Sequence, residues 1–99
     1  MTNERKRKII RTSQFKKDVR QANKQGKDMA ILEQVVDFLA DDIPLPEKFR
    51  DHALKGNWKD HRECHITPDW LLVYKKTDKR VLQLVLVRTA SHSNLIFNV

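Results

Sequence analysis

Apolar residues recur at helical spacing in two stretches of the first half of the chain. The stripes are Phe15, Val19 and Ala22 in the first stretch and Met29, Leu32, Val36 and Leu39 in the second. Ser13 is placed to cap the first helix and Asp28 the second. Gly26 lies between them and suits a left-handed turn. The pattern predicts two antiparallel helices joined in a helical hairpin.

Shorter patterns on either side of the helices predict β-strands. We expect strands at 6–11, 58–65, 69–74 and 80–88, with a hairpin turn at 76–79. The last strand has leucines on one face and valines on the other, which is typical of a strand inside a sheet. Pro44 and Pro46 cannot continue the second helix, so residues 43–57 are expected to form a long loop.

The order β-α-α-β-β-β predicts an α+β fold. In this fold the helical hairpin packs on one face of a mainly antiparallel four-stranded sheet. The chain has 99 residues, which suits one small domain over residues 1–99. The single cysteine, Cys64, excludes an internal disulfide and suits a reducing compartment such as the cytoplasm. No apolar run reaches the roughly 18 residues of a membrane span, and the basic N-terminal segment lacks the apolar part of a signal peptide.

Charge is unevenly distributed along the chain, whose net charge is +7. Residues 1–27 carry ten Lys or Arg against two acids, residues 28–69 carry five against ten, and residues 70–99 carry five against one. The two basic thirds would face a polyanion together if the fold placed them on one surface. A solvated surface explains the net charge alone equally well.

Four polar residues of the second half stand beside basic residues and near strand ends: His52, His65, Asp69 and His92. Imidazole exchanges protons near neutral pH, so histidines among cations indicate acid–base chemistry on a phosphate-bearing substrate. Strand alternation places His61, Glu63 and His65 on one face, and Arg62 and Cys64 on the other. A zinc site made by His61, Cys64 and His65 is therefore disfavoured.

Metal-independent RNA cleavage needs a base for the 2′-OH, an acid for the leaving 5′-oxygen and cations for the phosphoryl oxygens. Histidines, an aspartate and arginines supply all three. Each residue also has a structural alternative. A single histidine is more often structural than catalytic, and Asp69 suits a turn. Trp70 and Phe97 suit either the core or a surface on which bases stack.

Three phrases closely resemble the YafQ branch of the RelE/ParE toxin superfamily. They are Asp51-His52-Ala53-Leu54-Lys55-Gly56-Asn57-Trp58, Arg62-Glu63-Cys64-His65-Ile66-Thr67-Pro68-Asp69-Trp70-Leu71-Leu72-Val73-Tyr74 and Arg88-Thr89-Ala90-Ser91-His92-Ser93. The resemblance covers nearly the whole chain. It implies a fold like that of microbial ribonucleases and metal-independent cleavage of mRNA in the ribosomal A site. It also implies a cognate antitoxin as partner, with no membrane and no cofactor.

Carried over by matching phrase, the resemblance implies a catalytic set of His52, His65, Asp69 and His92. We expect His92 and Asp69 to exchange protons, while His52 and His65 orient or neutralise the phosphate. The substrate-binding residues expected beside them are Arg62, Trp70, Arg88 and Phe97. The family places its C-terminal phenylalanine four residues after the last histidine, whereas Phe97 is the fifth residue after His92.

Two other functions fit parts of the sequence. A ParE-like inhibitor of DNA gyrase on the same scaffold would not need the histidines. A non-catalytic RNA-binding module would need only the basic helices. Lys16, Lys17, Lys24 and Lys27 would contact ribosomal RNA in the nuclease hypothesis, with solvation or antitoxin contacts as the alternatives.

Overall fold

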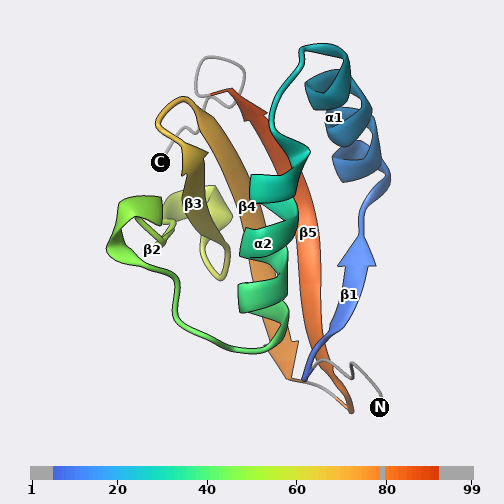
Figure 1. Cartoon of the computed structure of the whole chain (residues 1–99). Helices are drawn as coiled ribbons and strands as arrows, with labels where there is room; N and C mark the ends of the chain where they lie inside the picture. The colour runs from blue at the N-terminus through green and yellow to red at the C-terminus, as the bar shows by residue number, and fades with distance from the viewer. Residues whose placement is uncertain (1–5, 79, 92–99) are drawn as a thin grey trace, which may run out of the picture.

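Two helices cover one face of a five-stranded sheet in the computed structural model, which describes residues 6–78 and 80–91 (Figure 1). The elements are β1 (Lys8–Arg11), α1 (Ser13–Lys24), α2 (Met29–Ala40), the 3-10 turn η1 (Glu47–Phe49), β2 (His52–Ala53), the 3-10 turn η2 (Gly56–Trp58), β3 (Arg62–Thr67), β4 (Trp70–Asp78) and β5 (Leu82–Ser91). The sheet order is β1-β5-β4-β3-β2. β1 runs parallel to β5, and the other neighbours are antiparallel.

The helical hairpin forms where the sequence predicts it. Asp28 caps α2, accepting a hydrogen bond of 3.0 Å from the Ala30 N–H. Gly26 has a φ of 76°, the left-handed conformation expected at the end of α1. The cap of α1 is Thr12, one residue before the expected Ser13, and its hydroxyl accepts from the Phe15 N–H at 3.0 Å. Among the described residues, no helix has the length and apolarity to cross a membrane.

The main core lies between the helices and the sheet. The predicted stripes supply its helical half, with Phe15, Leu32 and Leu39 each at most 4% exposed. Alternate residues of the central strands supply the other half, chiefly Trp70, Leu72, Tyr74, Leu84 and Leu86. Burying each such side chain contributes roughly 1.5–3 kcal/mol relative to leaving it in water. β5 lies between β1 and β4, as its apolar faces predict.

The sheet has five strands where the sequence predicted four. The segment 43–57 is not a continuous loop, because His52 and Ala53 form β2 and pair with Glu63 and Arg62 of β3. Two residues are too few for an alternating pattern, which explains why the strand was missed. The expected strand at 58–65 begins later, at Arg62, and the expected turn at 76–79 is largely occupied by the end of β4.

A β-bulge interrupts the pairing of β4 with β5. Val73 pairs with Arg88 and the next residue, Tyr74, pairs with Leu86, so Val87 is an extra residue in β5. The regular leucine and valine alternation of β5 therefore ends at this point. Beyond the bulge, Thr89 is 1% exposed and its hydroxyl donates to the Leu71 carbonyl oxygen at 2.8 Å.

Candidate active site

The face of the sheet that the helices leave uncovered carries His52, Glu63 and His65. Glu63 pairs with Val73, and His65 pairs with Leu71. Directly opposed residues of antiparallel strands point to the same face. Leu71 and Val73 belong to a small apolar cluster separate from the main core, with Leu54, Trp58, Val87 and Ala90 packed against it. The polar residues therefore stand on the open face, beside an apolar surface.

The His52 ring is held between two hydrogen-bond acceptors. Its Nδ1 lies 2.7 Å from the Arg50 carbonyl oxygen. Its Nε2 lies 3.2 Å from Oε1 of Glu63, a carboxylate that is only 7% exposed. The other oxygen of Glu63, Oε2, is buried and makes no hydrogen bond within the described part of the chain. The pairing of β2 with β3 thus fixes both the position and the orientation of His52.

His65 lies next to His52, with 6.2 Å between the ring centroids. Its Nδ1 is 3.3 Å from the carbonyl oxygen of Pro68, in the turn between β3 and β4. Asp69 is exposed in the same turn. The structure therefore brings together two of the four expected catalytic residues and places a third in the turn that one of them contacts.

The remaining expected catalytic residue, His92, and the aromatic residue Phe97 lie outside the described residues. The last described residue of β5 is Ser91, which pairs with Trp70, the neighbour of Asp69 in the sequence. The described end of β5 therefore lies beside the β3–β4 turn.

The two expected phosphate-binding arginines are engaged in ion pairs. Arg62 Nε donates to Asp51 Oδ1 at 3.3 Å, and Asp51 also accepts from the Tyr74 hydroxyl at 2.5 Å. Arg88 Nε donates to Asp18 Oδ2 of α1 at 2.8 Å. Both guanidinium groups stay partly exposed, at 42% for the Arg62 side chain and 30% for Arg88.

Trp70 is a core residue in this structure, which corrects its assignment as a substrate-binding residue. Its side chain is 1% exposed, and Lys27 Nζ lies 5.8 Å from the ring centroid. A base cannot stack on a ring that the protein already covers. Trp58, by contrast, is partly exposed on the open face and meets the His61 ring edge-on, with 5.2 Å between centroids.

Cys64 faces the main core, on the opposite side of β3 from His65, as strand alternation predicts. It is 0% exposed, and burial raises the pKa of its thiol well above the usual range. The described residues contain no group of three or more His, Cys, Asp or Glu side chains placed to share a metal ion.

Glu63 is the residue of this site that the sequence analysis missed. Alternation had placed it on the same face as His65, and this was the available signal. Its partner His52 was expected in a loop, so no prediction connected the two. β2, which lies within residues 43–57, pairs with β3 and places His52 opposite Glu63.

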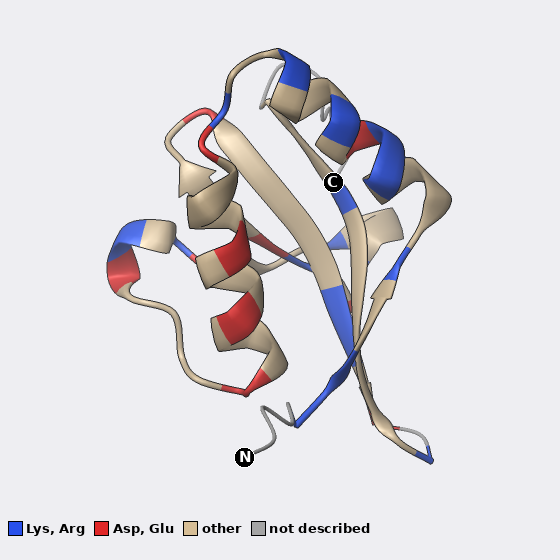
Figure 2. Ribbon diagram, turned by 45° about the vertical axis from the view of Figure 1, so that its right-hand side comes forward, with Lys and Arg blue, Asp and Glu red and all other residues tan. Residues whose placement is uncertain are grey.

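Charge is divided between the two helices (Figure 2). The α1 side chains Lys16, Lys17, Arg20 and Lys24 are exposed, whereas α2 carries Glu33 and Asp37 and no basic residue. Because α1 packs against β5, the basic N-terminal third lies next to the C-terminal third. The acidic α2 limits the basic surface to one side of the hairpin.

Residues 7–97 match the family described as the bacterial toxin of the type II toxin–antitoxin system, YafQ. The mRNA interferase toxin YafQ of Escherichia coli strain K12 is 42% identical over 90 residues, covering 90% of this chain and 95% of that protein. YafQ in the crystal structure of the E. coli DinJ–YafQ toxin–antitoxin complex has a TM-score of 0.83 and 41% identity, covering 93% of this chain and 99% of its own. A metal-bound toxin from Helicobacter pylori has a TM-score of 0.83 and 46% identity, covering 90% of this chain and 98% of its own.

Proposed function

Because the chain belongs to the YafQ family of bacterial toxins of type II toxin–antitoxin systems, it is an mRNA-cleaving toxin, and we propose that it cuts mRNA in the ribosomal A site. Residues 1–99 would form one toxin domain, acting in the cytoplasm and held inactive by a cognate antitoxin. The observation that carries the proposal is the meeting of His52 and His65 on the uncovered face of the sheet. Both come from sequence phrases in which histidines stand near basic residues, a pattern that indicates phosphate chemistry.

The proposed reaction is attack of a ribose 2′-OH on the adjacent phosphorus. One group removes the proton of the 2′-OH, and the bond from phosphorus to the 5′-oxygen breaks as a second group protonates that oxygen. We assign these transfers to Asp69 and His92. Each general acid or base contributes typically 10²–10⁴-fold to such a reaction. Asp69 is exposed in the β3–β4 turn, where a substrate reaches it without rearrangement of the core.

His52 is better suited to orient the phosphate than to act as the base. Its two ring nitrogens already face the Arg50 carbonyl oxygen and the Glu63 carboxylate, which fix the ring in place. A ring held in this way provides a fixed contact beside the scissile phosphate. His65, whose ring lies 6.2 Å away, completes the phosphate-binding pair.

Arg62 and Arg88 remain the proposed guanidinium contacts, and their ion pairs define how each is positioned. The Asp51 carboxylate holds Arg62 at the start of β3, and Asp18 holds Arg88 near the end of β5. Arg88 Nη2 also donates to Asp18 Oδ1 at 3.3 Å, so a phosphate would meet the remaining N–H groups of this guanidinium.

The proposed mechanism routes no step through a metal ion. The H. pylori relative is described as metal-bound. In residues 6–78 and 80–91, however, no set of three ligating side chains converges, and the Cys64 thiol is turned into the core. The donor groups present therefore do not fit a metal centre within the described structure.

Mapping mRNA 5′ ends by primer extension in a ribosome-containing translation reaction tests this function. Wild type should produce discrete cuts. His92→Ala and Asp69→Ala should each reduce the cleavage rate by about 10²–10⁴-fold. His61→Ala is the matched control, because His61 packs against Trp58 and is expected to be dispensable.

Two results would count against the proposal. If wild type leaves mRNA intact while supercoiling by DNA gyrase stops, the chain acts as a gyrase inhibitor. If folded His92→Ala cuts at the wild-type rate, the assigned proton transfers are wrong.

A further inference from the structure

A hollow of about 570 Å³ lies beside His65, at the outer edge of β3. Its walls come from α2, from η1 with the following Arg50, and from the β3–β4 turn. β2 pairs only with Arg62 and Glu63, so no described strand covers the edge of β3 from Cys64 to Thr67. The hollow therefore opens next to the proposed active site. Its volume falls within the range of roughly 300–1,000 Å³ that is typical of small-ligand sites.

The lining of this hollow suits a nucleotide. Its apolar floor consists of Ile31, which is partly exposed, and of Phe49 and Ile66, which are 6% and 4% exposed, so a base would bury surface mainly against Ile31. Lys48 and Arg50 supply two cations for a phosphate, and none of the lining residues is acidic. Its neutral hydrogen-bonding side chains are those of Gln34 and Thr67. The hollow therefore offers apolar surface for a base, cations for a phosphate and hydrogen-bonding groups for the edge of the base.

Arg50 connects this hollow to the histidines. Its backbone is left-handed, with φ and ψ both 47°, a conformation that disfavours any residue with a side chain other than Asn or Asp. Strained residues of this kind cluster at ligand sites. In this conformation the Arg50 carbonyl oxygen lies 2.7 Å from His52 Nδ1, while the residue also lines the hollow. One residue thus belongs both to the His52 site and to the adjoining cavity.

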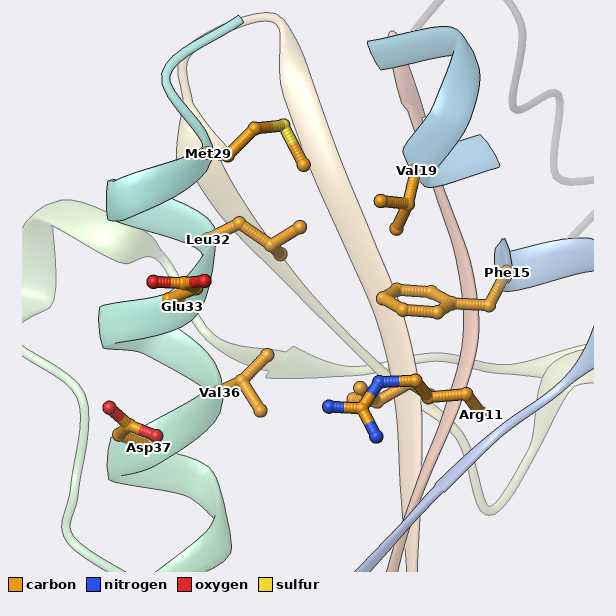
Figure 3. Close-up of a pocket in the computed structure, with 9 residues that line it drawn as sticks. Arg11, Phe15, Val19, Met29, Leu32, Glu33, Val36 and Asp37 are labelled. Carbon is orange, nitrogen blue, oxygen red and sulfur yellow. The ribbon is translucent and has the colours of Figure 1, made fainter. Parts of the chain in front are cut away.

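The groove between the two helices lacks this chemistry. It measures about 380 Å³, and Leu32 and Val36 of α2 face Phe15 and Arg11 across it, while Glu33 and Asp37 also belong to its lining (Figure 3). Its two carboxylates repel an anionic backbone, and it lies on the helix-covered face of the sheet, opposite the face that carries the histidines. RNA is therefore expected to favour the hollow beside His65.

We propose that the hollow beside His65 binds one nucleotide of the mRNA adjoining the cleaved bond. The base lies on the apolar floor, its phosphate lies beside Lys48 and Arg50, and Gln34 and Thr67 read the edge of the base. Phosphate contacts position RNA and base contacts carry sequence information. The inference rests on the proposed function, and it identifies where part of the sequence preference arises.

Cleavage mapping on ribosome-bound mRNAs that present every codon in turn tests the subsite. Lys48→Ala should raise KM about tenfold and affect kcat less, since it removes a charged contact to bound RNA. Gln34→Ala should change which codons are cut. Lys8→Ala is the matched control, because Lys8 is an exposed lysine of β1, at the opposite edge of the sheet. It should keep the wild-type KM and codon pattern.

The subsite is wrong if wild type cuts mRNA but Lys48→Ala and Gln34→Ala retain its KM and codon pattern. It is also wrong if these two variants change only the affinity for the antitoxin, which would assign the hollow to the protein interface. If wild type does not cut mRNA, the proposed function fails, and a short 2′-O-methyl RNA that cannot be cleaved decides the subsite separately. Binding that shifts the NMR signals of the Gln34 side-chain amide supports it, and unchanged signals overturn it.

Discussion

The Asp18 carboxylate of α1 binds Arg88 of β5, with 2.8 Å between Oδ2 and the Arg88 Nε. The same oxygen accepts a hydrogen bond of 3.0 Å from the backbone N–H of Thr89, just beyond the β-bulge. Asp18 is 9% exposed, so most of its contact with water has been replaced by these bonds. The Asp18 carboxylate therefore links α1 to β5, the strand whose last described residue precedes His92 in the sequence.

Replacing Asp18 should destabilise the protein strongly. Asp18→Ala leaves a partly buried guanidinium and a buried N–H without their acceptor, and we expect the free energy of unfolding to fall by about 2–4 kcal/mol. Asp18→Asn keeps the shape and one acceptor oxygen and should lose less. Urea unfolding followed by circular dichroism measures both. A loss below about 0.5 kcal/mol for Asp18→Ala, the range of ordinary surface changes, would contradict the assigned role.

The helical part of the fold was predictable because its signals are local. Leu32 and Val36 repeat with the period of a helix. Gly26 favours the left-handed turn after the first helix, and Asp28 favours the capping position of the second. The central position of β5 also followed from apolar residues on both of its faces. Each of these inferences needs only neighbours in the sequence.

The missed features depend on contacts between distant residues. β2 is a strand only because His52 and Ala53 meet β3, and nothing in two residues predicts that meeting. The bulge at Val87 is set by the pairing of β5 with β4. The burial of Trp70 is likewise decided by the face of β4 that the helices cover, since a tryptophan suits a core or a surface equally well. The sequence therefore pointed to His52 and His65, which the structure brings together, but it did not predict their contacts with Glu63 and Arg50.

The stability of the protein should fall in acid partly through Asp42. Arg7 Nε donates to Asp42 Oδ1 at 2.6 Å and Lys76 Nζ at 2.7 Å, and these bonds hold the pKa of Asp42 below its usual value. A lowered carboxyl pKa stabilises the folded state above the unfolded value of about 4, and this contribution is lost as the pH falls through the folded-state pKa.

Asp42→Asn should therefore lower the free energy of unfolding at neutral pH by about 1–3 kcal/mol. Urea titrations at several pH values should show this difference shrinking below about pH 4. Glu47→Gln, at an exposed position of η1, provides the control and should follow wild type throughout. A difference that stays constant into acid would show that the ion pairs are not its source.

Tyr74 should remain un-ionised in alkali for as long as the protein stays folded. Burial, and then its hydrogen bond to Asp51, raise the pKa of Tyr74 far above its usual value of about 10. The unfolded chain releases this proton more readily, so stability should decline as the pH rises above about 10. Tyr74 is the single tyrosine of the chain, so the change in near-ultraviolet absorbance that accompanies phenolate formation comes from it alone. Phenolate that forms while circular dichroism still reports a folded protein would contradict this prediction.

Glu63 should matter to catalysis more than to folding. Its Oε1 lies 3.2 Å from His52 Nε2, and neutralising it removes the charge that positions the ring. We expect Glu63→Gln to slow mRNA cleavage by about tenfold to a hundredfold, less than the ~10²–10⁴-fold of a direct acid or base. The Oε2 atom has no hydrogen-bond partner among the described residues, so the substitution breaks no hydrogen bond at that atom. Glu63→Asp, which restores the charge, should recover part of the rate, and Glu33→Gln on α2 should be silent. Equal loss of rate in Glu63→Asp and Glu63→Gln, with both variants stably folded, would show that charge at this position is not what His52 requires.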